Sequence, residues 1–342
     1  MIPRSLSRRI SGELEVIAAI QRKARPELAS SRAVRTGIGD DCAILRPKAG
    51  YEICVTTDFT LEERHFRRAW HPPESVGHRC LARGLSDLAA MGAEPLAVFL
   101  SLAVPARLPS AWVDRFLHGF LALARRHRVA LAGGDTAESA TVGKTRDGLI
   151  AADVVAIGQA PRGRAVLRSG ARPGDGIYVT GALGGAAAEF AQLAKTPRRF
   201  AGLTKAEPGH PHLYPEPRLE AGLRLRELAH AMIDESDGLS TDLTHVCEES
   251  DVAAVIEETL LPIDPRAARA QNPLEVALHG GEDYELLFTA PAAARIPRRL
   301  AGTPVHRIGS MVRRASGKPR ILLEAVDGKR VAVRSGGWEH FR

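Results

Sequence analysis

The sequence predicts two domains that each combine α-helices with β-strands, an α/β half followed by an α+β half. At 342 residues the chain exceeds the size at which a single hydrophobic core usually stops growing, and its 44% of hydrophobic residues can fill two cores. Helix-like and strand-like apolar patterns alternate as far as Ile157. Proline and glycine then interrupt the pattern at residues 159–163. We therefore expect an N-terminal domain of residues 1–160 and a C-terminal domain of residues 161–342.

The N-terminal half begins with a helix, because Ser11 is of a type that caps helices and apolar residues follow it at helical spacing. Two more amphipathic helices are expected at residues 76–91 and 112–125. In the first of these, three leucines share one face and Asp87 lies on another. Short apolar runs predict strands that end at acidic or turn-forming residues, at 51–57, 96–104, 129–132 and 151–157.

The C-terminal half starts again with a strand at residues 177–180, a glycine-rich turn at 181–185 and a helix. Residues 195–217 are rich in proline, histidine and glycine, and we interpret them as an ordered loop anchored by Leu213 and Tyr214. The remaining elements are a helix ending at residue 229, strands at 231–234 and 284–289, and short strands near residues 305, 321 and 331. A further helix is expected after residue 238, with one apolar stripe formed by Leu239, Leu243, Val246 and Cys247.

The cysteine content and the hydropathy pattern indicate a cytoplasmic protein. The four cysteines are far apart and form no C-x-x-C pair, so neither a zinc site nor a disulfide framework is indicated. The chain contains no apolar run of about 20 residues, the length that crosses a bilayer. Its N-terminus also lacks the apolar stretch of a secretory signal.

The net charge of +7 raises the question of nucleic-acid binding. Basic residues are spread along the chain and are not interleaved with the aromatic residues that single-strand binders use for stacking. We favour a solubilising surface that also attracts anionic nucleotides. No nucleic-acid or membrane partner is expected.

Acidic residues occur in six short clusters, each beside a glycine or at the end of an apolar run. They are residues 39–41, 56–58, 86–87, 133–135, 234–237 and 280–283. The 47 Lys and Arg outnumber the 40 Asp and Glu, so general acidity does not explain these clusters. Several carboxylates in one cleft repel each other unless cations hold them, and divalent ions that bridge to phosphates are the natural counterpart. The sequence therefore predicts a metal-dependent enzyme that acts on phosphates.

Well-known nucleotide-binding fingerprints are missing. The chain has no G-x-x-x-x-G-K-[ST] and no H-R-D catalytic loop, and Cys42 breaks the Rossmann pattern that begins at Gly37. The turn at residues 181–185 has the composition to offer backbone N–H groups to an anion, but a tight strand-to-helix turn explains it equally well. Phosphate handling must therefore come from another fold.

Nine segments in order along nearly the whole chain carry a family resemblance. They are GIGDDCAIL at 37–45, TTD at 56–58, RHF at 64–66, LSDLAAMGAEPL at 85–96, GGDT at 133–136, LRSGARPGD at 167–175, IDESDGL at 233–239, GGEDYELLFT at 280–289 and GWEHF at 337–341. Together they resemble the thiamine-monophosphate kinase family, within the superfamily that includes aminoimidazole-ribonucleotide synthetase and selenophosphate synthetase.

The resemblance implies a two-domain aminoimidazole-ribonucleotide synthetase-like fold whose N-terminal domains pair in a homodimer, with ATP in the cleft between the domains. It implies the Mg²⁺- and ATP-dependent phosphorylation of thiamine monophosphate to thiamine diphosphate. The implied metal ligands are Asp41, Thr56, Thr57, Asp58, Asp87, Asp135, Asp234 and Asp237, among which Asp87, Asp234 and Asp237 are the catalytic carboxylates. The implied ATP contacts are Thr57, Gly134, Asp135, Arg168 and Ser236, and the implied substrate contacts are His65, Glu282 and Trp338.

This chemistry agrees with the residue types. The second pKa of a phosphate monoester is about 6, so at neutral pH the acceptor already carries an anionic oxygen and needs no general base. The obstacle is repulsion between the acceptor and the ATP phosphates, which metal ions held by many carboxylates relieve. Arg168 can supply a fixed positive fork to the phosphates, while Trp338 and Glu282 suit the cationic thiazolium ring.

Structural roles stay open for several of these residues. Asp40 and Asp283 have the character of turn or cap residues, and that reading is favoured for both. His65 can equally be a partly buried, hydrogen-bonded histidine, and Trp338 can anchor the C-terminus. The chain also departs from the family's usual turn after Gly134, which leaves the nucleotide contacts of residues 137–148 open.

Two other functions stay open as well. The first is that of another ATP-using member of the superfamily. Selenophosphate synthetase is expected to have a reactive cysteine near a glycine-rich N-terminus, and the hydrogenase-maturation relative a C-terminal cysteine, and the sequence has neither. The second is a nucleotide- or nucleic-acid-binding protein whose phosphotransfer site has decayed, which the complete set of aspartates disfavours.

Overall fold

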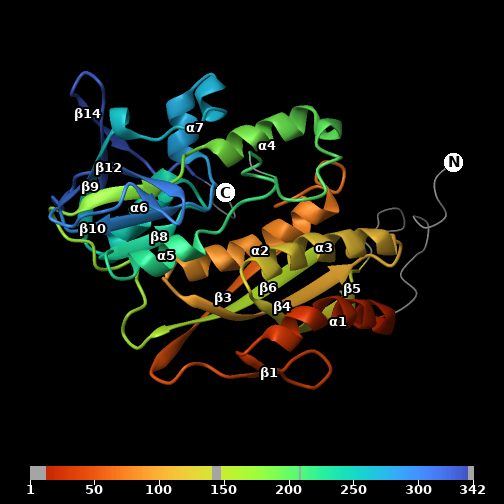
Figure 1. Ribbon diagram of the computed structural model, residues 1–342. Helices are drawn as coiled ribbons and strands as arrows, with labels where there is room; N and C mark the ends of the chain where they lie inside the picture. Colours follow the sequence, from red (N-terminus) through yellow and green to blue (C-terminus); the bar gives the residue numbers. More distant parts are fainter. Residues whose placement is uncertain (1–12, 141–147, 208, 338–342) are drawn as a thin grey trace. The chain divides into compact units, whose positions relative to one another are not determined.

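The computed structural model describes residues 13–140, 148–207 and 209–337 and divides the chain into two compact units (Figure 1). Unit 1 consists of Met1–Leu85, Pro95–Gln159 and Leu193–Pro208. Unit 2 consists of Ser86–Glu94, Ala160–Gln192 and Gly209–Arg342. The two units are therefore not continuous in sequence. Ser86–Glu94 packs with unit 2 although unit 1 surrounds it in sequence, and Leu193–Pro208 packs with unit 1 although unit 2 surrounds it.

Unit 1 is built on a four-stranded sheet in the order β3-β6-β4-β5. Its strands are β3 (Tyr51–Leu61), β6 (Ala151–Pro161), β4 (Glu94–Val104) and β5 (Ala130–Glu138). The helices are α1 (Glu13–Ser30), α2 (Pro73–Ala90) and α3 (Ser110–Arg126). In Figure 1, α2 and α3 cover one face of the sheet, and α1 runs beside β5. A small antiparallel pair, β1 (Val34–Thr36) and β2 (Ile44–Leu45), lies before β3.

The helices of unit 1 bury the faces that their spacing predicts. Leu81 and Leu85 of α2 are fully buried, as is Phe116 of α3. On α1, Lys23 Nζ lies 2.8 Å from Asp114 of α3, which ties the two helices together at the surface. The core therefore lies between the sheet and the pair α2 and α3.

Two strands of unit 1 are longer than the sequence suggested, so the predictions that they end at acidic clusters were wrong. β3 continues through Asp58 to Leu61, and β5 continues through Asp135 to Glu138. A polar residue does not stop a strand when a neighbouring strand offers backbone partners. β4 does so for β5, where Leu100 pairs with Gly134 in parallel register after a bulge.

Unit 2 contains an eight-stranded sheet in the order β14-β13-β9-β12-β7-β10-β8, with β11 paired to β12. Its strands are β7 (Gly176–Thr180), β8 (Ala231–Asp234), β9 (Val252–Glu257), β10 (Leu286–Ala290), β11 (Arg299–Leu300), β12 (Thr303–Arg313), β13 (Ile321–Glu324) and β14 (Arg330–Val333). Its helices are α4 (Gly185–Lys195), α5 (Leu219–Leu225), α6 (Leu239–Glu249) and α7 (Pro273–His279). The described part of this unit also has the short 3₁₀ turns η3 (Glu258–Leu260) and η4 (Ala267–Arg269), while η2 (Pro197–Arg199) belongs to unit 1.

One large core joins the sheet of unit 2 to α6. The predicted stripe of α6 is buried, with Leu239, Leu243 and Cys247 fully inaccessible. The loop that follows α4 is anchored as predicted, because Leu213 is 0% exposed and Tyr214 is 7% exposed. Sequence reasoning missed β9, a strand inside the sheet. None of the described helices is long and apolar enough to cross a membrane.

Candidate active site

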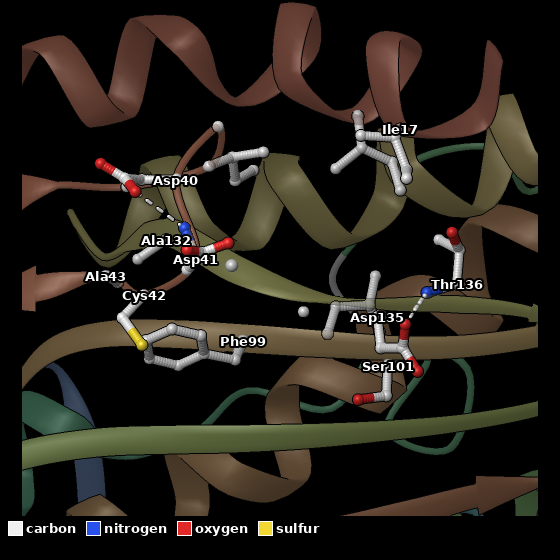
Figure 2. A pocket seen from close by; sticks show the side chains of 17 residues that line it. Ile17, Asp40, Asp41, Cys42, Ala43, Phe99, Ser101, Ala132, Asp135 and Thr136 are labelled. Atoms are coloured by element: carbon white, nitrogen blue, oxygen red, sulfur yellow. Dashed lines mark hydrogen bonds between the residues drawn. The ribbon is translucent and has the colours of Figure 1, made fainter. Parts of the chain in front are cut away.

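A cavity of about 740 Å³ opens in unit 1 above the middle of strands β4 and β5 (Figure 2). That volume lies in the range of small-molecule sites. Its wall is formed by α1, by the turn between β1 and β2, and by the two strands. The lining residues are Ile17, Ile20, Gly37, Ile38, Gly39, Asp40, Asp41, Cys42, Ala43, Phe99, Leu100, Ser101, Ala132, Gly133, Gly134, Asp135 and Thr136.

Three carboxylates reach this cavity from two elements. Asp40 and Asp41 come from the turn before β2, and Asp135 comes from β5. Asp40 has the turn role that the sequence favoured, because its Oδ1 accepts the Asp41 N–H at 2.9 Å. Asp135 Oδ1 accepts the N–H of Thr136 at 2.9 Å. Asp41 and Asp135 are both exposed at the cavity, so their oxygens can reach a ligand.

The strand beneath the cavity needs glycine at position 134. Gly134 has φ +149°, and a Cβ atom there would come within 1.8 Å of the Leu100 carbonyl oxygen on β4. A side chain at this position would push the two strands apart, so the backbone of β5 stays bare and a ligand can approach it closely. The structure thus brings together three of the predicted residues: Asp41, Gly134 and Asp135.

The predicted residues on β3 form a separate group. Asp58 lies 3.4 Å from Arg83 of α2, and Thr57 Oγ1 donates a 2.7 Å hydrogen bond to Asp153 of β6. β3 and β5 occupy opposite edges of the four-stranded sheet, which places them about 14 Å apart. Thr56 and Asp58 are on one face of β3 and Thr57 is on the other, because side chains alternate along a strand.

His65 lies outside the residues that line the cavity, and its ring is fixed by its own turn. Its Nδ1 accepts the N–H of Leu61 at 2.9 Å, which leaves the ring hydrogen on Nε2 when the histidine is neutral. Its carbonyl oxygen accepts a 2.7 Å hydrogen bond from the buried Arg79. These contacts hold the ring in one orientation. A fixed ring is compatible with a structural role and with a substrate-binding role, so the prediction for His65 stays a prediction.

In unit 2, the connection between β8 and α6 carries the second group of predicted residues. Asp234 ends β8 and is 3% exposed. Its Oδ2 accepts a 2.7 Å hydrogen bond from Ser86, the residue before Asp87 on α2. Asp87 therefore lies beside the β8–α6 connection, which also carries Ser236 and Asp237.

Asp242 supports this connection, and sequence reasoning missed it. Its Oδ2 accepts the N–H groups of Asp237 and Gly238, each at 3.1 Å. Burial raises the pKa of Asp242 well above its usual value, and the charges of Asp234 and Asp237 raise it further. The carboxylates of Asp234 and Asp237 therefore act on the buried Asp242. The sequence did contain a signal for this role, because an acidic residue in the first turn of a helix can accept N–H groups of the residues that precede the helix.

Asp283 has the capping role that the sequence favoured. Its two oxygens accept the N–H groups of Gly184 and of Ala186, the latter at 2.7 Å. The glycine-rich turn before α4 thus binds an anion from the chain itself. Burial raises the pKa of Asp283 to about 7, and the two amides offset part of this effect.

Glu235 is a second buried acid that sequence reasoning missed. The residue is 0% exposed, and a backbone hydrogen bond from Leu239 to its carboxylate offsets only part of the cost of burial. Burial raises its pKa well above the usual value, and the charge of Asp283 raises it further. In the sequence, Glu235 lies inside the acidic cluster 234–237, and nothing distinguished it there from the neighbouring aspartates.

Glu282 lies against the same connection. Its N–H donates to the Ser236 carbonyl oxygen at 2.8 Å, and its backbone is in the left-handed region with φ 67°. A non-glycine residue in that region costs roughly 1–3 kcal/mol, and such residues are frequent at binding sites. Glu282 Oε2 is 3.0 Å from Nδ1 of the buried His212. Unit 2 thus brings together Asp234, Ser236, Asp237 and Glu282.

Arg168 is not joined to these groups, and one further predicted residue is not described. Arg168 is exposed in unit 2, with its guanidinium on the surface, and its carbonyl oxygen accepts a 3.2 Å hydrogen bond from Ser250. Trp338 and its predicted contact with the substrate lie outside the described residues. Within residues 13–140, 148–207 and 209–337, no group of three or more His, Cys, Asp or Glu side chains is placed to hold a metal ion.

Comparisons with known proteins identify the family. The model of the AIR synthase related protein N-terminal domain matches residues 39–160, and that of the C-terminal domain matches residues 172–321. The thiamine-monophosphate kinase of Escherichia coli K12 is 38% identical over 338 residues, which are 96% of this chain and 98% of the relative. The chain belongs to the thiamine-monophosphate kinase family.

Solved structures of the family have the same fold. The thiamine-monophosphate kinase of Stenotrophomonas maltophilia K279a is 34% identical and superposes with a TM-score of 0.75, covering 92% of this chain and 97% of that one. A family member named AaThiL, solved in complex with AMPPCP and TMP, is 29% identical with a TM-score of 0.71 and covers 96% of this chain and 97% of that one. The predicted two-domain fold of mixed helices and strands is confirmed.

Proposed function

We propose that the chain transfers the terminal phosphoryl group of ATP to thiamine monophosphate and so makes thiamine diphosphate. The observation that carries this proposal is the carboxylate-lined cavity over a bare glycine strand in unit 1, in a chain that matches thiamine-monophosphate kinases over nearly its whole length. The related structure with AMPPCP and TMP supports the same pair of substrates.

Unit 1 provides the donor side. Asp41 and Asp135 would hold Mg²⁺ against the ATP phosphates, and the bare backbone at Gly134 would let the nucleotide approach β5. Thr56 and Asp58 share one face of β3, about 14 Å from β5, so they would offer oxygens to a separate metal ion. Mg²⁺ is usually bound by one or two carboxylates together with substrate phosphates and water, so exposed pairs of acids fit the ion without a cluster of three. When bound, the ion neutralises charge on the phosphates and holds them in line.

Unit 2 provides a second set of carboxylates. Asp87, Asp234 and Asp237 would be the catalytic carboxylates, which would hold Mg²⁺ against the phosphates, and Ser86, the residue before Asp87, donates a hydrogen bond to Asp234. Asp242 orients Asp237 by holding the backbone N–H groups of residues 237 and 238. Arg168 and Ser236 would contact the ATP phosphates. Arg168 is exposed, so its side chain is accessible to a ligand.

Glu282 and His65 would contact the acceptor, together with Trp338. The carboxylate of Glu282 suits the cationic thiazolium ring of thiamine, and its backbone is fixed on Ser236. The acceptor phosphate loses its second proton at a pH of about 6, so no side chain has to remove a proton from it. Turnover should therefore rise with pH through that value and then level off.

A homodimer formed through unit 1 is part of the proposal. Three apolar side chains on the edge strand β3 are exposed: Ile53 at 47%, Val55 at 62% and Phe59 at 60%. They alternate along the strand and so share one face of the sheet. An apolar stripe on an edge strand is a liability unless another chain covers it.

All four cysteines are free thiols, in keeping with an enzyme of the reducing cytoplasm.

The proposal is tested by incubating purified protein with ATP, Mg²⁺ and thiamine monophosphate and separating the products by chromatography. We expect one thiamine diphosphate for each ADP formed. Thiamine without a phosphate should not be an acceptor, because the nucleophile is the phosphate oxygen. Asp135→Asn should lower turnover strongly while it leaves the fold intact. ATP consumption that is independent of thiamine monophosphate would contradict the proposal.

A further inference from the structure

The segment of unit 2 that precedes α5 is held in place by one buried carboxylate. Glu189 of α4 is 2% exposed. Its Oε2 accepts the N–H of His212 at 2.8 Å and that of Leu213 at 3.4 Å, and its Oε1 lies 2.5 Å from Nδ1 of His210. The segment also closes on itself, because the N–H of Tyr214 donates to the His210 carbonyl oxygen at 2.8 Å. The backbone that carries His212 is therefore fixed.

The ring of His212 is buried and has two neighbours of different character. The side chain is 2% exposed. The ring of Phe190, on α4, packs against the imidazole with 5.1 Å between the ring centroids. Nδ1 of His212 lies 3.0 Å from Oε2 of Glu282. The imidazole thus contacts an aromatic ring and a carboxylate, and its fixed backbone leaves it little freedom to move.

The backbone of Glu282 is fixed, whereas its side chain reaches solvent. Its φ is 67°, and its N–H donates to the Ser236 carbonyl oxygen at 2.8 Å. The side chain is 28% exposed, so the carboxylate is accessible to a ligand. A glutamate side chain has several rotatable bonds, and ordering it when a ligand binds lowers the affinity. A contact that holds the carboxylate in place beforehand reduces this cost.

Histidine suits this task because its neutral ring can donate a hydrogen bond without carrying a charge. The carboxylate that it holds then keeps its full charge for a cation. The Nδ1 hydrogen of His212 does not aim straight at Oε2 of Glu282, but at 3.0 Å a small turn of the glutamate side chain aligns the two. Because His212 is buried, it acts on a ligand through Glu282 and not by direct contact.

We propose that His212 is a positioning residue that holds the Glu282 carboxylate for the cationic thiazolium ring of thiamine monophosphate. This inference rests on the proposed function, in which Glu282 contacts the acceptor. Glu189 contributes indirectly, because it fixes the backbone that carries the imidazole.

His212→Phe tests the inference, because phenylalanine keeps an aromatic ring against Phe190 and removes the ring nitrogen. His212→Asn returns an N–H donor near the position of Nδ1 and should recover part of the affinity. His210→Phe is the matched control, since it changes a histidine of the same segment whose ring contacts Glu189. His212→Phe is also made in a Glu282→Gln background, which completes a double-mutant cycle.

Two ligands are titrated calorimetrically into each protein. The first is thiamine monophosphate, and the second is its analogue in which a neutral thiophene ring replaces the thiazolium. For His212→Phe we expect thiamine monophosphate to bind about five-fold more weakly, the effect of one hydrogen bond, while the neutral analogue stays within about two-fold of the wild type. In the Glu282→Gln background, His212→Phe should change neither affinity by more than about two-fold. The two affinities are compared within one protein, so a smaller folded fraction does not alter their ratio.

The outcomes separate the inference from the proposed function. Equal losses of thiamine monophosphate affinity in His212→Phe and His210→Phe would overturn the inference, because the effect would then come from the segment in general. An equal loss for the neutral analogue, or an undiminished effect of His212→Phe in the Glu282→Gln background, would overturn it too.

Unchanged thiamine monophosphate affinity in His212→Phe, with an active wild type, would refute the positioning role alone. A wild-type protein that neither binds nor phosphorylates thiamine monophosphate would refute the proposed function, and the positioning role with it.

Discussion

Asp283→Asn tests whether a buried carboxylate makes unit 2 sensitive to pH. The wild-type side chain is 6% exposed and caps the start of α4 through the amides of Gly184 and Ala186. Burial raises its pKa to about 7 from the usual 3.8. Asparagine has nearly the same shape but carries no charge at any pH, and it can accept only one of the two hydrogen bonds.

The expected magnitude follows from the pKa. Because the folded state raises the pKa, the stabilisation is fully present below pH 3.8 and is lost as the pH rises through about 7. The full difference corresponds to roughly 4 kcal/mol, of which about 2.5 kcal/mol is lost between pH 5 and pH 8. Asp283 is not among the groups that raise the pKa of Asp242, but its charge raises the pKa of Glu235, so the comparison measures Asp283 together with its repulsion of Glu235.

The assay is urea unfolding of both proteins at pH 5, 6, 7 and 8, followed by circular dichroism. The lost hydrogen bond should destabilise Asp283→Asn by about 1–3 kcal/mol at pH 5. The advantage of the wild type should then shrink by about 2.5 kcal/mol as the pH rises to 8. A gap between the two proteins that is the same at all four pH values would refute the reasoning.

Three further predictions concern the site and the assembly. Gly134→Ala should lower the melting temperature and weaken ATP binding, because its Cβ would come within 1.8 Å of a main-chain oxygen of β4; unchanged ATP affinity by calorimetry would contradict this. Ser86→Ala should lower kcat about ten-fold, since buried Asp234 loses a 2.7 Å hydrogen bond, and a kcat equal to that of the wild type would count against it. Phe59→Asp should turn dimers into monomers in light scattering, whereas Phe190→Asp, which changes an exposed aromatic of unit 2, should not.

Much of the fold was predictable because burial leaves a periodic mark on the sequence. The stripe of Leu239 and Leu243 predicted the buried face of α6, and β8 was placed at its observed residues, 231–234. The errors arose where a tertiary partner decides. β3 and β5 run past Asp58 and Asp135 because neighbouring strands satisfy their backbones.

The candidate site was predictable only as far as single motifs go. The acidic clusters at residues 39–41 and 133–135 were expected to face one cleft, and both line the cavity, but no motif indicated that Ile17 and Ile20 of α1 would complete its wall. Asp242 accepts a hydrogen bond from the backbone of Asp237, and Ser86 donates one to Asp234. Such contacts between a supporting residue and a site residue depend on how the elements pack. Their spacing in the sequence therefore carried little information.

The central claim is direct transfer of a phosphoryl group from ATP to thiamine monophosphate. It is tested most directly in a rapid-quench experiment that uses ATP labelled in its terminal phosphate, Mg²⁺ and excess thiamine monophosphate. We predict that the label leaves ATP and enters the terminal phosphate of thiamine diphosphate in equal amounts. Label found in inorganic phosphate, with thiamine monophosphate left unchanged, would contradict the account.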